Sequence, residues 1–487
     1  MQHLSYIDYT IIIVYLVAIA SLGKIRGGKQ KTVKDYFVGS QEVPWWTISF
    51  SIVAAETSTL TFISIPGLAY LTNLNFLQLT FGYLIGRIIV AAYFLPAYYK
   101  GELSTAYSYL QNRFGNKTRS IASVTFLFTR IASDGVRLFA TAIPLYLMLD
   151  IQPIVAIVIM AIVALLYTFT GGLKGVIWVD AVQMIIYIGG AIVSIFYLFH
   201  FIPLSFSGIF DSTDVNSKLS IINLGFENGI KGFFSQPYTL ISGIVGGAFL
   251  SMSSHGTDQL IVQRLLAAKN LAESKKAIIT TGVIIIFQFA LFLFIGILLY
   301  VYYGSIDLKS DEIFPKFIIE VLPVGIKGLI IAGLFAAALS TLAGSITSLS
   351  SSVMIDLYLP FTKSIDEKRN LLLSKMLTIF WAAMLIFSAF IFMNSPGTVV
   401  ELALSIASFT YGGLLGVFLL GLSNKNVQQK HAIPAFFTAI ICMSFIILFN
   451  VVAWTWFVLS GVLITLIVGN TLYLIFGKVK TAKHTFE

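Results

Sequence analysis

The stretch Ala54–Gly67, AAETSTLTFISIPG, carries polar side chains of a kind that membrane segments seldom contain. One carboxylate, Glu56, is followed within eight residues by five hydroxyl side chains, all inside an apolar run that starts near Val43. Polar groups are costly in a hydrocarbon layer and mark ion or solute paths where they occur. Pro66 and Gly67 also disfavour regular helix. The stretch therefore predicts an interrupted helix that lines a cavity at membrane depth.

A second polar run, GLFAAALSTLAGSITSLSSSVMIDLY, extends over Gly333–Tyr358. Small residues recur in it every four positions and form a stripe that lets membrane helices pack closely: Ala336, Ser340, Gly344, Ser348 and Ser352. The run also places adjacent hydroxyls at Ser340 and Thr341, one turn after the Ala337 carbonyl. Hydroxyl and carbonyl oxygens are the ligands that a small hard cation prefers. The run fits either a packing surface or a weak cation site.

The composition predicts that the elements which hold these polar residues are membrane helices. The 487 residues are 57% hydrophobic and 11% charged, whereas soluble proteins are about 45–50% apolar and about 25% charged. A bilayer core needs about 20 apolar residues per helix. We therefore predict an all-α polytopic membrane protein with about 13 transmembrane helices, over residues 6–25, 43–70, 75–99, 120–148, 152–170, 176–200, 236–258, 277–303, 324–352, 372–393, 398–422, 431–451 and 453–477.

Basic residues alternate between the two sides of this predicted bundle. Of the 31 lysines and arginines, 23 lie on one side of the bundle. They include the basic residues of the loop after the first span and those of the segment after the last span. Positive loops stay in the cytoplasm, so we predict a multi-pass protein of the cell inner (plasma) membrane with its N-terminus outside and its C-terminus cytoplasmic. The same distribution accounts for the net charge of +9 without a nucleic-acid partner. The lipid bilayer is the expected environment, and no obligate protein partner is evident.

Two predicted spans are irregular in matching ways. The second, 43–70, holds the polar cluster, and the seventh, 236–258, holds Pro237 and glycines at 243, 246 and 247. Interrupted helices at corresponding positions of two halves indicate an inverted-repeat transporter. Alternatively, the glycines serve close helix packing.

Three segments together resemble the signature stretches of the sodium:solute symporter family. They are GGLKGVIWVDAVQ (Gly171–Gln183), TDQLIVQRLLAAKN (Thr257–Asn270) and AAALSTLAGSITSLSSSVMIDLY (Ala336–Tyr358), and the resemblance runs over about residues 5–477. The family includes sodium/galactose, sodium/proline, sodium/sialic acid and sodium/glucose transporters. The resemblance implies a LeuT-like fold of two inverted five-helix repeats, with one extra N-terminal helix and two C-terminal helices.

The resemblance also divides the chain into parts. Residues 1–42 hold the extra helix and the first cytoplasmic loop, 43–200 the first repeat, 201–235 an external loop, 236–422 the second repeat, and 423–487 the two C-terminal helices and a cytoplasmic tail.

A sodium site between the second and ninth spans follows from the same resemblance. Its ligands would be the carbonyls of Ala54, Thr57 and Ala337 and the hydroxyls of Ser340 and Thr341. Some sialic acid symporters bind a second sodium with two further serines and an aspartate that matches Asp180. Those two serine positions are Ala343 and Gly344 here, so we expect one sodium ion only.

The solute site is expected outward of this sodium site. The resemblance places Glu56, Ser58, Thr61 and Phe76 at solute-facing positions, with Gln78 and Thr80 as further candidates. The arginine that grips the carboxylate in sialic acid symporters aligns with Ser133. Arg137, one turn further on, either binds a solute carboxylate bidentately or pairs with Asp134.

Several other polar residues have expected roles around this site. Glu56 would suit the hydroxyls of a sugar or polyol, or the charge of an amine. Asp180, His255 and Asp258 are candidates for gating or coupling, and Arg87 and Arg130 are expected to snorkel or to pair.

The sequence thus favours a sodium-coupled symporter that imports a small organic solute of the sugar, polyol or sugar-acid class by alternating access. A monocarboxylate, a vitamin or an amino acid is the alternative solute. Proton coupling through Glu56, Asp134 or His255 is a rival that the sodium ligands make secondary. An enzyme is not expected, because no HExxH motif or Cys–His set is present. A channel or sensor is disfavoured because the polar residues concentrate at mid-span and no soluble domain is attached.

Overall fold

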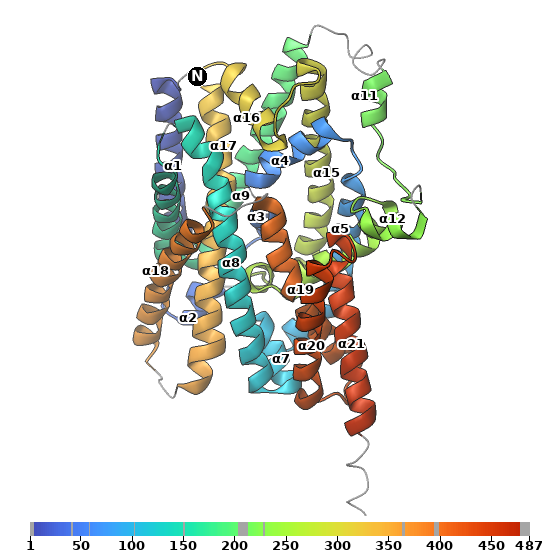
Figure 1. Cartoon of the computed structure of the whole chain (residues 1–487). Coiled ribbons are helices and arrows are strands. Elements are labelled where there is room, and N and C mark those ends of the chain that lie inside the picture. The colour runs from blue at the N-terminus through green and yellow to red at the C-terminus, as the bar shows by residue number, and fades with distance from the viewer. Residues whose placement is uncertain are drawn as a thin grey trace, which may run out of the picture.

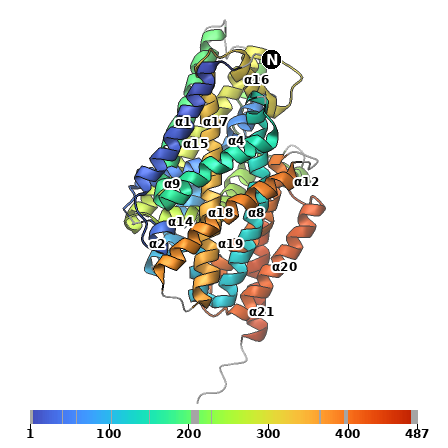
Figure 2. The same cartoon turned by 90° about the vertical axis from the view of Figure 1, so that its left-hand side faces the viewer.

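The computed structural model describes residues 4–39, 42–57, 59–101, 103–149, 151–202, 213–226, 229–362, 366–393 and 399–477. Its long helices run side by side along one axis (Figures 1 and 2). The N-terminus lies at one end of this bundle, and α21 ends at the other. The prediction of an all-α fold is confirmed for these residues.

The first half of the chain forms α1 (Tyr6–Gly27), α2 (Val33–Phe37), α3 (Trp45–Glu56), α4 (Thr59–Leu71), α5 (Leu77–Ile89), the π-helix η1 (Val90–Phe94), α6 (Leu95–Lys100), α7 (Ala106–Phe114), α8 (Asn116–Leu149), α9 (Pro153–Phe201), α11 (Thr213–Lys218) and α12 (Gly229–Ser235). The second half forms the π-helix η2 (Ser242–Gly246), α13 (Gly247–Gly256), α14 (Gln259–Leu266), α15 (Leu271–Tyr303), α16 (Ser310–Glu320), α17 (Ile326–Ser351), η3 (Ser352–Tyr358), η4 (Leu359–Phe361), α18 (Glu367–Phe392), α19 (Val399–Ser423), α20 (Gln429–Leu448), η5 (Trp454–Trp456) and α21 (Phe457–Phe476).

The described residues contain eight helices that are long and apolar enough to cross a membrane, or nine if α3 and α4 form one bent span. The predicted spans 120–148, 236–258 and 398–422 fall on α8, on η2 with α13, and on α19, which are not among those helices. Two further predicted spans lie in the single helix α9. The multi-pass character is therefore established, and the count of thirteen stays a prediction.

α9 is too long for one crossing. Its 49 residues would extend about 74 Å, more than twice the thickness of a bilayer core. Gly172 divides it, with φ 56° and ψ −163°, a backbone conformation that favours glycine. A Cβ atom at this position would also lie 2.8 Å from the Tyr36 carbonyl oxygen. The kink separates the two segments that the sequence predicts as the fifth and sixth spans.

The polar stretch around Glu56 is broken as predicted. Residues Trp45–Glu56 and Thr61–Leu71 form two helices bent by 64°, and Thr57 between them is extended, with φ −88° and ψ 103°. Pro66 lies inside α4 and is not the break. Gly67 serves a different purpose, because a Cβ atom there would clash with the Ser310 carbonyl of α16.

The matching break expected in the seventh span is a wrong prediction for the described residues. Residues 242–246 form a π-helix that continues into α13 with helical backbone angles. Its glycines serve packing instead, since a Cβ atom at Gly247 would lie 2.6 Å from the Leu79 carbonyl oxygen of α5.

α17 forms the centre of the bundle and positions the candidate site. Every residue from Ile330 to Ser351 is buried, as expected for a helix surrounded by others. Its start is fixed by Asp8 of α1, whose carboxylate accepts hydrogen bonds from the backbone N–H groups of Gly325 (2.7 Å) and Gly328 (2.9 Å). Neighbouring helices include α1, α3, α4, α8, α9 and α18.

Candidate functional site

The backbone carbonyls at the end of α3 are candidate cation ligands. The last four carbonyls of a helix lack partners within it. Of these, the Val53 oxygen accepts bonds from the Thr57 backbone N–H (2.9 Å) and hydroxyl (2.6 Å). Ala54 and Thr57 are themselves buried. The carbonyls of these two residues are therefore suited to bind a cation where the helix stops.

The hydroxyl residues of α17 lie across from this break. The Thr341 hydroxyl donates to the Ala337 carbonyl at 3.2 Å, and the Ser340 hydroxyl is buried without a hydrogen-bond partner among the described residues. The Thr59 hydroxyl of α4 donates to the Leu334 carbonyl at 3.1 Å, which ties the broken segment to α17. The two groups of predicted sodium ligands thus lie on helices that pack against each other.

Asp180 of α9 is held by a buried cation. Its Oδ2 lies 2.9 Å from Arg264 Nη2, and neither side chain has exposed surface. The Ser51 hydroxyl donates to the same oxygen at 2.7 Å and accepts from Arg264 Nε at 2.9 Å. A Cβ atom at Gly344 would lie 2.7 Å from Arg264 Nη2. The guanidinium therefore occupies the space beside α17 that Gly344 leaves open, and it balances the Asp180 charge.

Glu56 pairs with two residues that sequence reasoning did not connect to it. Its Oε2 lies 2.5 Å from Arg87 Nη2 of α5 and 3.4 Å from His255 Nε2 of α13. His255 Nδ1 lies 2.8 Å from the Ser254 hydroxyl. Arg87 is fully buried, whereas the Glu56 side chain is 23% exposed. An arginine midway along an apolar span needs a partner, and this is the signal from which the pair could have been found.

A second ion-pair network joins α8, α14 and α19. Arg130 lies between two carboxylates, 3.2 Å from Asp134 and 3.3 Å from Asp258. Arg137 Nη1 lies 3.5 Å from Asp134, so this arginine makes the pair that the sequence offered as one alternative. The Tyr411 hydroxyl donates to Asp258 at 2.7 Å. Asp258 also accepts from the Leu260 N–H and so caps α14.

Asp134 also contacts α17. The Ser345 hydroxyl lies within bonding distance of the Asp134 carboxylate and of the Thr341 carbonyl, the latter at 2.9 Å. The network is therefore adjacent to a predicted sodium ligand.

The remaining predicted solute residues each have contacts of their own. Thr61 is partly buried on α4, and Phe76 stacks on Phe289 with ring centroids 5.0 Å apart. Gln78 is engaged by the backbone, since its amide donates to the Tyr238 carbonyl (3.2 Å) and accepts from the Asn223 N–H (3.2 Å).

Three further candidates complete this account. The Thr80 hydroxyl donates to the Leu77 carbonyl at 2.7 Å. Ser133 is buried with its hydroxyl unpaired among the described residues. Ser58 lies outside the described residues.

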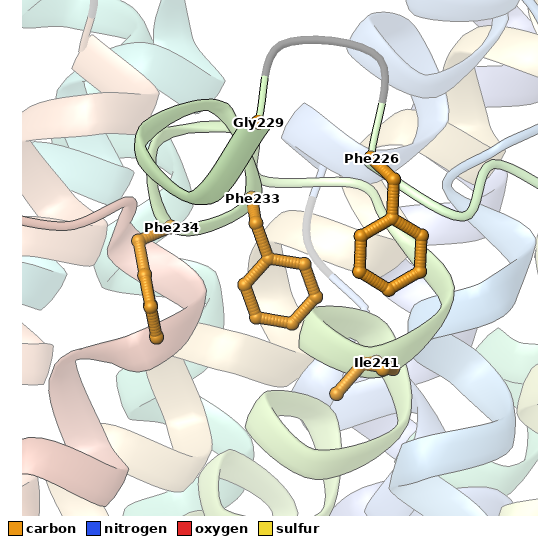
Figure 3. Close-up of a pocket in the computed structure, with 5 residues that line it drawn as sticks. All are labelled: Phe226, Gly229, Phe233, Phe234 and Ile241. Atoms are coloured by element: carbon orange, nitrogen blue, oxygen red, sulfur yellow. The ribbon is translucent and has the colours of Figure 1, made fainter.

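An apolar cavity of about 370 Å³ lies apart from these residues. Phe226, Gly229, Phe233, Phe234 and Ile241 line it (Figure 3). Phe233 and Phe234 also pack against Trp456, with centroids 5.9 and 5.5 Å apart. Its lining offers no polar side chain to an ion or a polar solute, so we do not assign it to the site.

Comparisons with known proteins identify the family. The profile of the sodium:solute symporter family matches residues 36–439. The sodium/sialic acid symporter of Proteus mirabilis is 28% identical over 90% of this chain and 89% of its own length. The sodium/glucose cotransporter of Vibrio parahaemolyticus is 27% identical over 88% of this chain and 83% of its own length.

Solved structures extend the agreement to the fold. A Na⁺-coupled sialic acid symporter in its substrate-bound outward-open state superposes with a TM-score of 0.88. It is 26% identical, with 97% of this chain and 98% of that chain covered. A nucleobase-cation-symport-1 family transporter, at 12% identity, has a TM-score of 0.61 over 92% of this chain and 96% of that one, and shares the fold.

A helical bundle with one broken helix against a buried, hydroxyl-rich helix defines a secondary transporter of the LeuT-like class. The chain belongs to the sodium:solute symporter family. It is a sodium-coupled symporter in a membrane and not an enzyme. The recognition made from three sequence segments is confirmed.

Proposed function

We propose that this symporter imports a small organic solute of the sugar-acid class together with one sodium ion, by alternating access. The solute class is supported by relatives that are named as sialic acid symporters and by a neighbouring structure that is a substrate-bound sialic acid symporter. The proposal keeps the predicted membrane orientation, with the N-terminus outside. It also keeps the two five-helix repeats at 43–200 and 236–422.

The proposed sodium site is supported by one observation: α3 ends at Glu56 and packs against α17. The proposed ligands are the carbonyls of Ala54, Thr57 and Ala337 and the hydroxyls of Ser340 and Thr341. All five residues are buried. Neutral oxygens make a weak site, which suits an ion that must leave in every cycle.

A single sodium ion is supported by the surroundings of Asp180. In two-sodium relatives this aspartate and two serines would serve a second ion. Here Gly344 offers no oxygen, and Arg264 already neutralises the carboxylate at 2.9 Å. A second cation would add a charge beside a guanidinium, which is unfavourable at low dielectric.

Sodium-driven uptake into proteoliposomes tests the proposed sodium site. Ser340→Ala and Thr341→Ala should each raise the sodium concentration needed for half-maximal uptake about tenfold, since each removes one ion ligand. Thr347→Ala is the matched control, because its hydroxyl, on the same helix, donates to the Ala343 carbonyl at 2.6 Å. Unchanged sodium dependence in the first two variants would exclude these ligands.

Proton coupling is the second candidate, and the Glu56–His255 contact favours it. The same vesicles distinguish the two. Uptake driven by a pH gradient in the complete absence of sodium would support the proton and contradict the sodium proposal.

A further inference from the structure

Arg87 is a buried cation whose guanidinium is only partly used. Glu56 contacts a single nitrogen, Nη2, at 2.5 Å. Arg87 Nε and Nη1 have no hydrogen-bond partner among the described residues, although the side chain has no exposed surface. Buried polar groups are nearly always paired in folded proteins, so two unpaired donors on one buried side chain require an explanation.

The free donors have the geometry of a carboxylate site. A guanidinium presents two edges of parallel N–H groups, and Nη2 belongs to both, shared with Nε on one side and with Nη1 on the other. Glu56 Oε2 can occupy only one of the two Nη2 hydrogens. One complete edge therefore remains available, and a planar carboxylate fits such an edge bidentately.

Further polar groups lie on the neighbouring helix. On α13, Ser251 Oγ is buried and makes no hydrogen bond within the described residues. Ser251 packs against Gly86, the residue before Arg87. His255 approaches the same Glu56 oxygen at 3.4 Å. Arg87 and His255 both contact Glu56, the last residue of α3, so this cluster lies at the broken helix.

We propose that Arg87 binds the carboxylate of an anionic solute through the edge that Glu56 leaves free, and that Arg87 thereby sets a preference for acids over neutral solutes. The inference rests on the proposed sodium-coupled import and names the residue that selects its solute. It assigns this role to Arg87 and not to Arg137, which is 22% exposed and shares Asp134 with Arg130.

The charges explain how such binding is coupled to sodium. Arg87 and Glu56 cancel each other, so a solute carboxylate adds one uncompensated negative charge to an apolar bundle. A sodium ion on the carbonyls of Ala54 and Thr57, which flank Glu56 in the chain, supplies the matching positive charge. Each ligand therefore strengthens the binding of the other. A cycle with one sodium and one monoanion moves no net charge across the membrane.

Purified full-length protein in proteoliposomes tests the proposal with three pairs of probes: sialic acid and its methyl ester, gluconate and sorbitol, and lactate and lactamide. Sodium-driven uptake should prefer the acid of at least one pair, by about 30-fold or more for a desolvated charge pair. In Glu56→Gln/Arg87→Gln this preference should vanish. The double variant is used because Arg87→Gln alone leaves the partly buried Glu56 without its arginine counter-charge. Arg137→Gln is the matched control and should retain the preference.

The outcomes separate this proposal from the proposed function. Sodium-driven uptake of neutral solutes only, or an acid preference that survives in the double variant, overturns the role of Arg87 and leaves sodium symport intact. Acid uptake that needs Arg87 but no sodium supports Arg87 and overturns the proposed coupling. A membrane potential set by potassium and valinomycin should leave acid uptake unchanged, whereas a neutral solute would show up to roughly 50-fold more accumulation per 100 mV. Loss of the acid preference in Arg137→Gln alone would also contradict the assignment.

Discussion

The buried pair of Asp180 and Arg264 allows a quantitative test of the packing around α17. Asp180→Asn keeps the side chain's shape and can still accept the hydrogen bond from Ser51. In the unsubstituted protein the Arg264 guanidinium lies 2.9 Å from this carboxylate and has no exposed surface. The substitution therefore leaves a buried guanidinium without a counter-charge. Removal of one member of a buried ion pair costs about 3–5 kcal/mol. We expect Asp180→Asn to lower the free energy of unfolding by this amount.

The double variant Asp180→Asn/Arg264→Gln should be considerably more stable than Asp180→Asn, because no charge then remains buried. The coupling free energy from the double-mutant cycle should be about 2–3 kcal/mol. Equilibrium unfolding of the purified protein in mixed SDS and detergent micelles, followed by fluorescence of its six tryptophans, measures each variant. The exposed pair of Lys316 and Glu320, 2.8 Å apart, is the control and should give about 0.5 kcal/mol or less.

A coupling as small as that of the control pair would refute the reasoning. It would mean that Arg264 reaches water or another anion in the folded protein. Arg264 would then not neutralise Asp180 in place of a second sodium ion.

Two further predictions concern contacts between helices. Gly67→Ala should destabilise the protein by about 1–3 kcal/mol in the same unfolding assay, because the added Cβ meets the Ser310 carbonyl; Gly189→Ala, at a position with open space, should not. Tyr411→Phe removes the 2.7 Å hydrogen bond to the Asp258 carboxylate and should cost about 1.5–3 kcal/mol, so an unchanged unfolding curve would show that this hydroxyl is not engaged.

The break at Thr57 was predictable because all the residues that indicate it lie in one short segment. A carboxylate and several hydroxyls in a membrane-length apolar run need a cavity, and the cavity needs unwound backbone. The seventh span offered a weaker signal. Its glycines fitted either a helix break or close helix packing. The close approach of Gly247 to the Leu79 carbonyl shows that they serve packing.

The partners of the charged residues were not predictable in the same way. Glu56 and Arg87 are 31 positions apart on different helices, and the pair depends on how each helix is rotated about its axis. Hydropathy gives the length of a span but little about rotation when all faces are apolar. The place of Arg264 over Gly344 likewise depends on the packing of α14 against α17.

Ser345 carries one proton and has two acceptors within reach. Its hydroxyl lies at bonding distance from the Thr341 carbonyl and from the Asp134 carboxylate, yet it can donate to only one of them at a time. The two hydrogen bonds are therefore mutually exclusive. The carbonyl of Thr341, a proposed ion ligand, and the Asp134 carboxylate of α8 compete for the same hydrogen. When the Ser345 hydroxyl turns from one acceptor to the other, the first loses a hydrogen bond and the second gains one, without any movement of the main chain.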